Sequence, residues 1–310
     1  FKSASVVVGG LVFLLLLFLA FKFLIQPNYQ LDKGIKKVLV ASRSAESTQS
    51  PIYNELKQEV ATYYKSSALD LKDIINVVLL LSKAGFSLEQ ILEGFDDVLD
   101  LAVVTYTDIN VTVVAVSYFY FLFYEQLSYT VNPKEQLQYT ANILAEAWQK
   151  DIELDEIVIL MKHLSSIDRI LIEVNYEDLI AALSVISNRD RQNLISVFVQ
   201  IAKQPHMLRD LGIVFAARSS IEFIDVMNRF HNIYVRQGYE QTTLYEFSQV
   251  LGYADAQAII NVLRHYDRFK KEAAEIGKNF SSLELKLKLI KEQTFWNLLK
   301  IISRRAIVIF

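Results

Sequence analysis

The sequence predicts an all-α fold, in which an N-terminal hydrophobic helix precedes an array of amphipathic helical hairpins. Three observations lead to this prediction. Glycine and proline are scarce, at 9 and 4 of 310 residues, which argues against an all-β fold with many short strands. Apolar residues recur at helical spacing along most of the chain. Capping signals recur where these apolar periods begin and end.

The composition excludes several kinds of site. The 32 basic and 35 acidic residues give a net charge of -3, so there is no global electrostatic reason to bind nucleic acid, and we expect no sequence-specific nucleic-acid partner. The absence of cysteine excludes disulfides, thiolate metal ligands and cysteine nucleophiles. The chain starts at Phe1 and stops inside an apolar run, so we expect an ordered piece of a longer polypeptide.

The first segment, residues 1–26, is predicted to be a hydrophobic helix. Residues 6–25 contain one charge, Lys22, and are about long enough to span a bilayer. A helix buried in a protein assembly fits the same pattern, and the two interpretations stay open. The apolar residues expected to face lipid or protein include Val6, Leu11, Leu14, Leu15, Leu16, Leu17, Phe18 and Phe21.

Residues 27–51 are predicted to form a linker with a short helix. Pro27 is expected to end the hydrophobic segment. A positive cluster follows, made of Lys33, Lys36, Lys37 and Arg43. Such a cluster beside an apolar helix suits the cytoplasmic side of a membrane, although flanking charges also mark the end of any hydrophobic helix.

A helical core domain is predicted over residues 52–277, and its clearest feature is a hairpin turn. Ser67 is expected to cap a helix that has Asp70 in its first turn. That helix should end at Gly85, because glycine adopts the left-handed conformation of a helix C-terminus. Ser87 and Gln90 then match a capping box for a second helix, from residue 88 to residue 100 or beyond.

The most apolar stretch of the core is residues 111–124. Its β-branched and aromatic side chains suit a strand by local propensity. Its length and the helices on both sides favour a helix that is buried nearly all round. A second membrane span is disfavoured, because the stretch is short and is bounded by Asp108 and Glu125.

Caps and stops predict the remaining helices. Those of the core cover residues 52–64, 134–150, 154–164, 179–187, 190–203, 221–236, 243–251 and 254–276. The last segment, residues 278–310, is predicted to be a long helix over residues 283–302 that continues beyond the end of the sequence.

No catalytic, cofactor-binding or metal-binding residues are predicted, and we expect the protein not to be an enzyme. None of the histidines has a glutamate three residues before it, as di-iron bundles require; they are His163, His206, His231 and His265. The densest acidic cluster is Asp96, Asp97 and Asp100. Paired carboxylates can perform acid–base chemistry, but their helical spacing here predicts a solvated face of an amphipathic helix.

Three segments carry a resemblance to a known family. Residues 79–93 read LLLSKAGFSLEQILE and are followed by VLDLA at residues 98–102. A Thr-Asp pair at Thr107 and Asp108 precedes the next helix, and residues 175–183 read NYEDLIAAL. These segments, and the order of elements from about residue 24 to residue 276, resemble the core region of phage tail tape-measure proteins. The chain departs from that family where it has Val, Ile, Phe and Tyr in place of Ala and Gly.

The resemblance implies a structural ruler, without a cofactor, that fills the lumen of a phage tail tube so that its length sets tail length. It also implies that the chain leaves the tube ahead of the DNA and aids passage across the host inner membrane. The implied partners are other copies of the chain, tail tube and tail tip proteins, and that membrane. The alternative is a single-pass, membrane-anchored helical scaffold or interaction module. A helical enzyme that uses the aspartate cluster is the third hypothesis.

Overall fold

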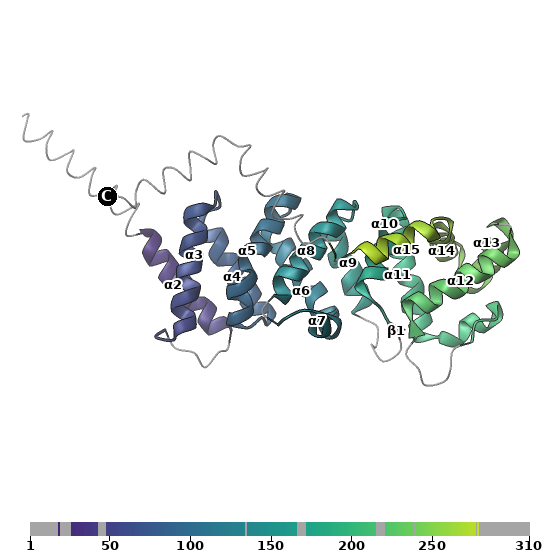
Figure 1. Ribbon diagram of the computed structural model, residues 1–310, viewed down its shortest axis with the longest axis horizontal. Coiled ribbons are helices and arrows are strands. Elements are labelled where there is room, and N and C mark those ends of the chain that lie inside the picture. The colour runs from purple at the N-terminus through teal and green to yellow at the C-terminus, as the bar shows by residue number, and fades with distance from the viewer. Residues whose placement is uncertain are drawn as a thin grey trace, which may run out of the picture. The chain divides into compact units, whose positions relative to one another are not determined.

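The computed structural model describes residues 18, 26–42, 48–133, 135–165, 172–214, 221–238, 240–276 and 278. These residues are almost entirely helical, which confirms the predicted all-α class (Figure 1). They divide into two compact units, one that ends at Asp100 and one that begins at Leu101. The predicted core domain therefore contributes residues to both units.

The first unit contains α2 (Gln26–Ala41), α3 (Pro51–Ser66), α4 (Leu71–Ala84) and the first part of α5 (Leu88–Thr105). Helix α2 packs against α3 and α4, and α3 packs against α4. Helices α2, α3 and α4 each bury one apolar face. In α4 this face includes Ile74, Val77, Val78 and Leu81, at helical spacing.

The second unit contains most of the helices. They are α6 (Ile109–Leu122), α7 (Tyr124–Thr130), α8 (Gln136–Gln149), α9 (Leu154–Leu164), α10 (Tyr176–Ser184), α11 (Asn188–Lys203), the 3-10 helix η2 (Pro205–Leu211), α12 (Phe223–Gln237), α13 (Glu240–Leu251), α14 (Tyr253–Arg264) and α15 (Tyr266–Glu275). Helix α6 packs on α8 and α9, α11 packs on α9 and α14, and α10 packs on α15. Two short parallel strands, β1 (Ile172–Glu173) and β2 (Ile221–Glu222), pair with Ile172 opposite Ile221.

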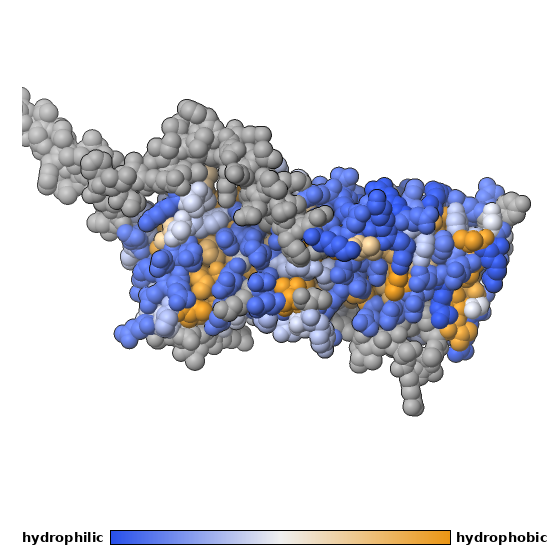
Figure 2. Space-filling view, viewed as in Figure 1, coloured by the Kyte–Doolittle hydropathy of each residue, from blue (hydrophilic) through white to orange (hydrophobic). Residues whose placement is uncertain are grey.

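Residues 111–122 of the apolar stretch lie in α6, so the helical prediction is confirmed for them, and the helix breaks at Phe123 before α7 begins at Tyr124. The N-cap of α6 is Asp108, whose Oδ1 accepts a hydrogen bond from the Asn110 amide at 2.8 Å. The prediction of burial nearly all round is only partly correct. Val114 and Phe121, seven residues apart on one stripe, are 40% and 39% exposed. Figure 2 shows that hydrophobic residues reach the surface in separate patches among hydrophilic ones.

The prediction for Ser67 is wrong. Ser67 is the C-cap of α3, and its amide donates to the Tyr63 carbonyl at 2.8 Å. Asp70 is the N-cap of α4, with the extended backbone typical of that position, and Asp73 takes the place in the first turn. Serine and aspartate are both common N-cap residues. Because α3 extends to Ser66, Ser67 ends that helix and Asp70 begins the next one.

The single helix predicted over residues 254–276 is also wrong, because it is broken at His265. There the backbone leaves helical geometry, at φ -113° and ψ 28°, and the His265 amide donates to the Val262 carbonyl at 3.0 Å. Helix α15 then begins at Tyr266, packs on α10 and buries Phe269 completely. Helical periodicity continues across such a break, so the pattern does not reveal it.

Further differences concern the segment around Pro27, a missed helix and a short strand. Pro27 lies within α2, which is longer than the predicted short helix. Helix α7 was not predicted, and Ile221 and Glu222, assigned to a helix by the sequence, form β2.

The predicted hydrophobic helix at residues 6–25 lies outside the described residues, except for Phe18, which is helical and exposed. The helix predicted at residues 283–302 also lies outside them. Among the described residues, no helix combines the length and the hydrophobicity that a membrane crossing requires.

Candidate functional site

The turn between α4 and α5 is built by the residues that the sequence singled out. Gly85 has φ 108° and ψ 10°, in the left-handed region that glycine adopts without a steric penalty. The Phe86 amide donates back to the Leu81 carbonyl at 3.2 Å. The capping box is present: the Ser87 amide donates to Gln90 Oε1 at 3.0 Å, and the Gln90 amide donates to Ser87 Oγ at 3.2 Å. This turn fixes where α4 ends.

Close packing fixes α4 against α2. A Cβ atom at Gly34 of α2 would lie 2.5 Å from Ile75 Cγ2 of α4, so the two helices approach where one of them has no side chain. The buried hydroxyl of Ser82 donates to the Val38 carbonyl at 3.1 Å and adds a polar link between the same helices. The exposed faces of α2 and α4 are therefore held in a defined register.

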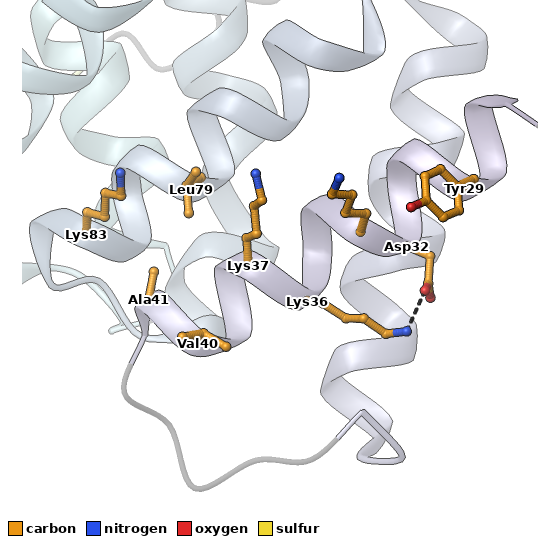
Figure 3. Close-up of a pocket in the computed structure, with 9 residues that line it drawn as sticks. Tyr29, Asp32, Lys36, Lys37, Val40, Ala41, Leu79 and Lys83 are labelled. Carbon is orange, nitrogen blue, oxygen red and sulfur yellow. Dashed lines mark ion pairs between the residues drawn. The ribbon is translucent and has the colours of Figure 1, made fainter.

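A groove of about 800 Å³ runs along these two helices (Figure 3). We call it the basic groove, because four of its lining residues are lysines. It is lined by Tyr29, Asp32, Lys33, Lys36, Lys37, Val40 and Ala41 of α2, and by Leu79 and Lys83 of α4. Figure 3 shows the amino groups of Lys37 and Lys83 pointing to the same side, with Leu79 between them.

The one acidic residue of the basic groove, Asp32, is engaged by neighbouring groups. Lys36 Nζ lies 2.7 Å from Asp32 Oδ2, and Lys57 Nζ of α3 lies 3.0 Å from Oδ1, which also accepts from the Tyr53 hydroxyl at 3.2 Å. The hydrogen bonds from Lys36 and Lys57 lower the pKa of Asp32 to about 2. Burial, and then the bond to Asp32, raise the pKa of Tyr53 to about 12.

The other three lysines of the groove are differently placed. All three are exposed, and within the part of the chain that the structure describes Lys33, Lys37 and Lys83 make no ion pair. Lys33 Nζ lies 5.9 Å from the centre of the Tyr29 ring, within the range of a cation–π contact. With Asp32 satisfied by Lys36 and Lys57, the groove presents three ammonium groups to an anion.

The aspartate cluster of α5 is not the solvated face that the sequence predicted. All three carboxylates are only partly exposed. Asp100 Oδ1 accepts a hydrogen bond of 2.6 Å from the hydroxyl of Tyr63 on α3. Burial, and then the charge of Asp100, raise the pKa of Asp96. The aspartates lie on a helix, as their spacing predicted, but helical periodicity does not show that α3 covers this side of α5.

The histidines do not come together. His163, His206 and His265 are exposed. The His231 ring stacks on Tyr266 with ring centres 3.7 Å apart, and burial lowers the pKa of His231. Across the described ranges, no group of three or more His, Asp or Glu side chains is placed to hold a metal ion.

Buried polar groups of the second unit join helices to one another. Arg191 of α11 is 2% exposed. Its Nε donates to the Leu183 carbonyl at 2.9 Å, and its Nη1 donates to the Asp151 carbonyl at 2.8 Å and to Glu156 Oε2 at 2.7 Å. One side chain thus joins the end of α10 and the start of α9 to α11.

The same arrangement recurs elsewhere in this unit. Gln200 Nε2 of α11 donates to Asp255 Oδ2 of α14 at 2.7 Å. The hydroxyls of Tyr139 and Tyr176 share a hydrogen bond of 2.8 Å between α8 and α10. Sequence reasoning did not find these pairs, since their members lie 37 to 55 residues apart.

Of the predicted positive cluster, Lys33, Lys36 and Lys37 line the basic groove, and Arg43 lies outside the described residues. The structure adds Lys83 to the groove. In the sequence, Lys83 could have been recognised as a basic residue in the last turn of α4, just before Gly85. The predicted contact residues from Val6 to Leu17, and Phe21, lie outside the described residues. No family model, no curated protein and no solved structure matches this chain.

Proposed function

We propose that this chain is part of the core region of a phage tail tape-measure protein. In this function it fills the tail tube, sets tail length and aids delivery of the genome through the host membrane. The observation that carries the proposal is the position of the family-like segments. Residues 79–93 span the end of α4, the turn and the start of α5, with Gly85 at the left-handed position and the Ser87–Gln90 capping box after it.

The other two segments also lie at helix starts. Asp108 caps α6, and Asn175 caps α10, where its Oδ1 accepts from the Glu177 amide at 2.9 Å. The residues that carry the resemblance are therefore those that determine where helices begin and end. A shared pattern at such positions supports a shared order of helices.

Buried and partly buried polar groups support a structural function. Arg191, Gln200 and Tyr176 each join one helix to another through hydrogen bonds. A ruler needs helices that keep their order, and a continuous helix converts residue number into length at about 1.5 Å per residue.

The partners of this function are other copies of the chain, tail tube and tail tip proteins, and the host inner membrane, with no sequence-specific nucleic acid. The proposed location is the lumen of the tail tube in the virion, and the host membrane during infection. Exposed aromatic residues of the second unit offer contact area for such partners, among them Tyr106, Tyr129, Tyr245 and Tyr253.

A second candidate is a single-pass, membrane-anchored helical scaffold or interaction module. The basic groove favours it, because α2 follows the apolar residues 6–25 directly in the sequence and carries three of the groove's lysines. This candidate requires no relation between chain length and the size of an assembly.

Tail length separates the two candidates. An in-frame deletion of residues 240–264, which form α13 and α14, should shorten the tail, measured by electron microscopy of the phage. The two helices pack against each other, so the shortening should be less than the about 1.5 Å per residue of one continuous helix. The matched control is Gly85→Val, which strains the α4–α5 turn without changing the residue count and should leave tail length unchanged. Normal tails from the deletion would remove the ruler function and leave the anchored module.

A further inference from the structure

We propose that the basic groove binds the phosphate groups of anionic phospholipids and so docks the first unit on the surface of an anionic bilayer. This inference deepens the membrane step of the proposed function and concerns one defined surface, formed by α2 and α4.

The charge of the groove supports an anionic ligand. Its lining contains four ammonium groups and one carboxylate, and that carboxylate is also bonded by Lys57 from outside the groove. Lys33, Lys37 and Lys83 come from two helices that Gly34 and the Ser82–Val38 hydrogen bond hold together. Their ammonium groups are therefore brought to one surface by the fold as well as by their spacing in the sequence.

Apolar groups at the groove favour a membrane over other sources of phosphate. Tyr29 near one end of α2 is 65% exposed, and Val40 at the other end is 80% exposed. Exposed aromatic and aliphatic side chains beside lysines can contact the apolar edge of a bilayer while the ammonium groups reach the phosphates. A free phosphate ion or a nucleic-acid backbone would gain nothing from Val40.

Helix α2 is amphipathic, with one face buried and the other exposed. Leu31, Gly34, Ile35 and Val38 are buried in the unit, whereas Lys33, Lys36, Lys37 and Val40 face outward. Tyr29 follows residue 25, the last of the apolar stretch, by four positions in the sequence. If residues 6–25 were inserted in a membrane, the lysines of α2 would follow them closely in the sequence and so would lie near the lipid headgroups.

The test is co-sedimentation of the full 310-residue chain with phosphatidylcholine vesicles that contain or lack phosphatidylserine. All proteins carry Leu15→Arg and Leu16→Arg, so that insertion of residues 6–25 does not mask binding by the groove. We expect binding that requires phosphatidylserine and weakens as the salt concentration rises.

The decisive variant is Lys33→Gln/Lys37→Gln/Lys83→Gln. Each lysine near an anionic surface strengthens binding about fivefold, so the triple variant should bind on the order of a hundredfold more weakly. The matched control is Lys72→Gln/Lys162→Gln/Lys203→Gln, which removes the same charge from exposed positions outside the groove. Asp32→Asn removes the one carboxylate of the groove and should strengthen binding. Circular dichroism of each variant verifies that the helices are retained.

Three results would overturn the proposal. An equal loss of binding in the two triple variants would show general attraction between the chain and the vesicle. Displacement by inorganic phosphate, at an ionic strength where chloride has no effect, would identify a site for the free ion. Displacement by a single-stranded oligonucleotide at that ionic strength would identify a nucleic-acid surface. None of these results changes the tail-length experiment, so the two proposals fail separately.

Discussion

The two units of this chain use charge in opposite ways. In the second unit Arg191 is 2% exposed, and it is bonded to two carbonyl groups and to Glu156. In the first unit Lys33, Lys37 and Lys83 are exposed, and no ion pair engages them within the described residues. The buried charge is satisfied by the protein itself, whereas the exposed lysines remain available to a ligand.

This difference indicates where binding can occur. A buried charge that lost its partners would cost several kcal/mol, so the groups around Arg191 cannot be removed without a loss of stability. Exposed lysines contribute little to stability, so those of the basic groove can be removed to test binding without unfolding the unit. The difference therefore directs the search for a ligand to the surface of α2 and α4.

The largest effect is expected from Arg191→Met. It leaves Glu156 and the carbonyl groups of Leu183 and Asp151 without their donor, and breaking a buried pair in this way costs about 3–5 kcal/mol. Urea unfolding measures the loss. The control Lys203→Met, at an exposed position of the same helix, should change the free energy of unfolding by less than about 0.5 kcal/mol. If the two variants lost similar amounts of unfolding free energy, buried and exposed charges would not differ in their contribution to stability.

A smaller loss is expected from Gly85→Val in the first unit. Valine must adopt a left-handed backbone there, which costs about 1–2 kcal/mol, and its branched side chain adds to the strain. Gly85→Asn should cost less, because asparagine tolerates this region better than valine. Thermal unfolding followed by circular dichroism measures both. A melting temperature unaltered by valine would show that the turn does not contribute to stability.

The pH dependence of Asp96→Asn gives the next prediction. Burial raises the pKa of Asp96, so the folded state holds this proton more tightly than the unfolded state does. The stability that the group contributes is therefore present at low pH and is lost as the pH rises through the folded-state pKa. Asparagine does not titrate, so Asp96→Asn avoids this loss of stability. The free energy of unfolding of the variant, measured in urea, should therefore increase relative to that of the parent protein between about pH 4 and about pH 7. An advantage that is equal at both pH values would contradict this.

The sequence predicted those features that local chemistry determines. The turn at Gly85 and the capping box of Ser87 and Gln90 are formed within a few residues, so their signals are complete in the sequence. The lysines of α2 were found for the same reason. Only Lys83 was missed, because its place beside Lys37 depends on how α4 packs on α2.

The features that the sequence did not predict all depend on tertiary contacts. After the break at His265, α15 packs on α10 and buries Phe269, and the cover over Asp100 comes from Tyr63, which is 37 residues away. Arg191 had no local signal either, because its partners are the carbonyl groups of Leu183 and Asp151 and the carboxylate of Glu156. Helical periodicity identifies the buried face of a helix but not the element that covers it.

The most direct test of this account is the free energy of unfolding of Lys33→Gln/Lys37→Gln/Lys83→Gln, measured in urea beside Arg191→Met. If the lysines of the basic groove serve a ligand, the triple variant should change stability by no more than about 0.5 kcal/mol for each substitution. A loss as large as that of Arg191→Met would show that these lysines hold the first unit together, and the account would then be wrong.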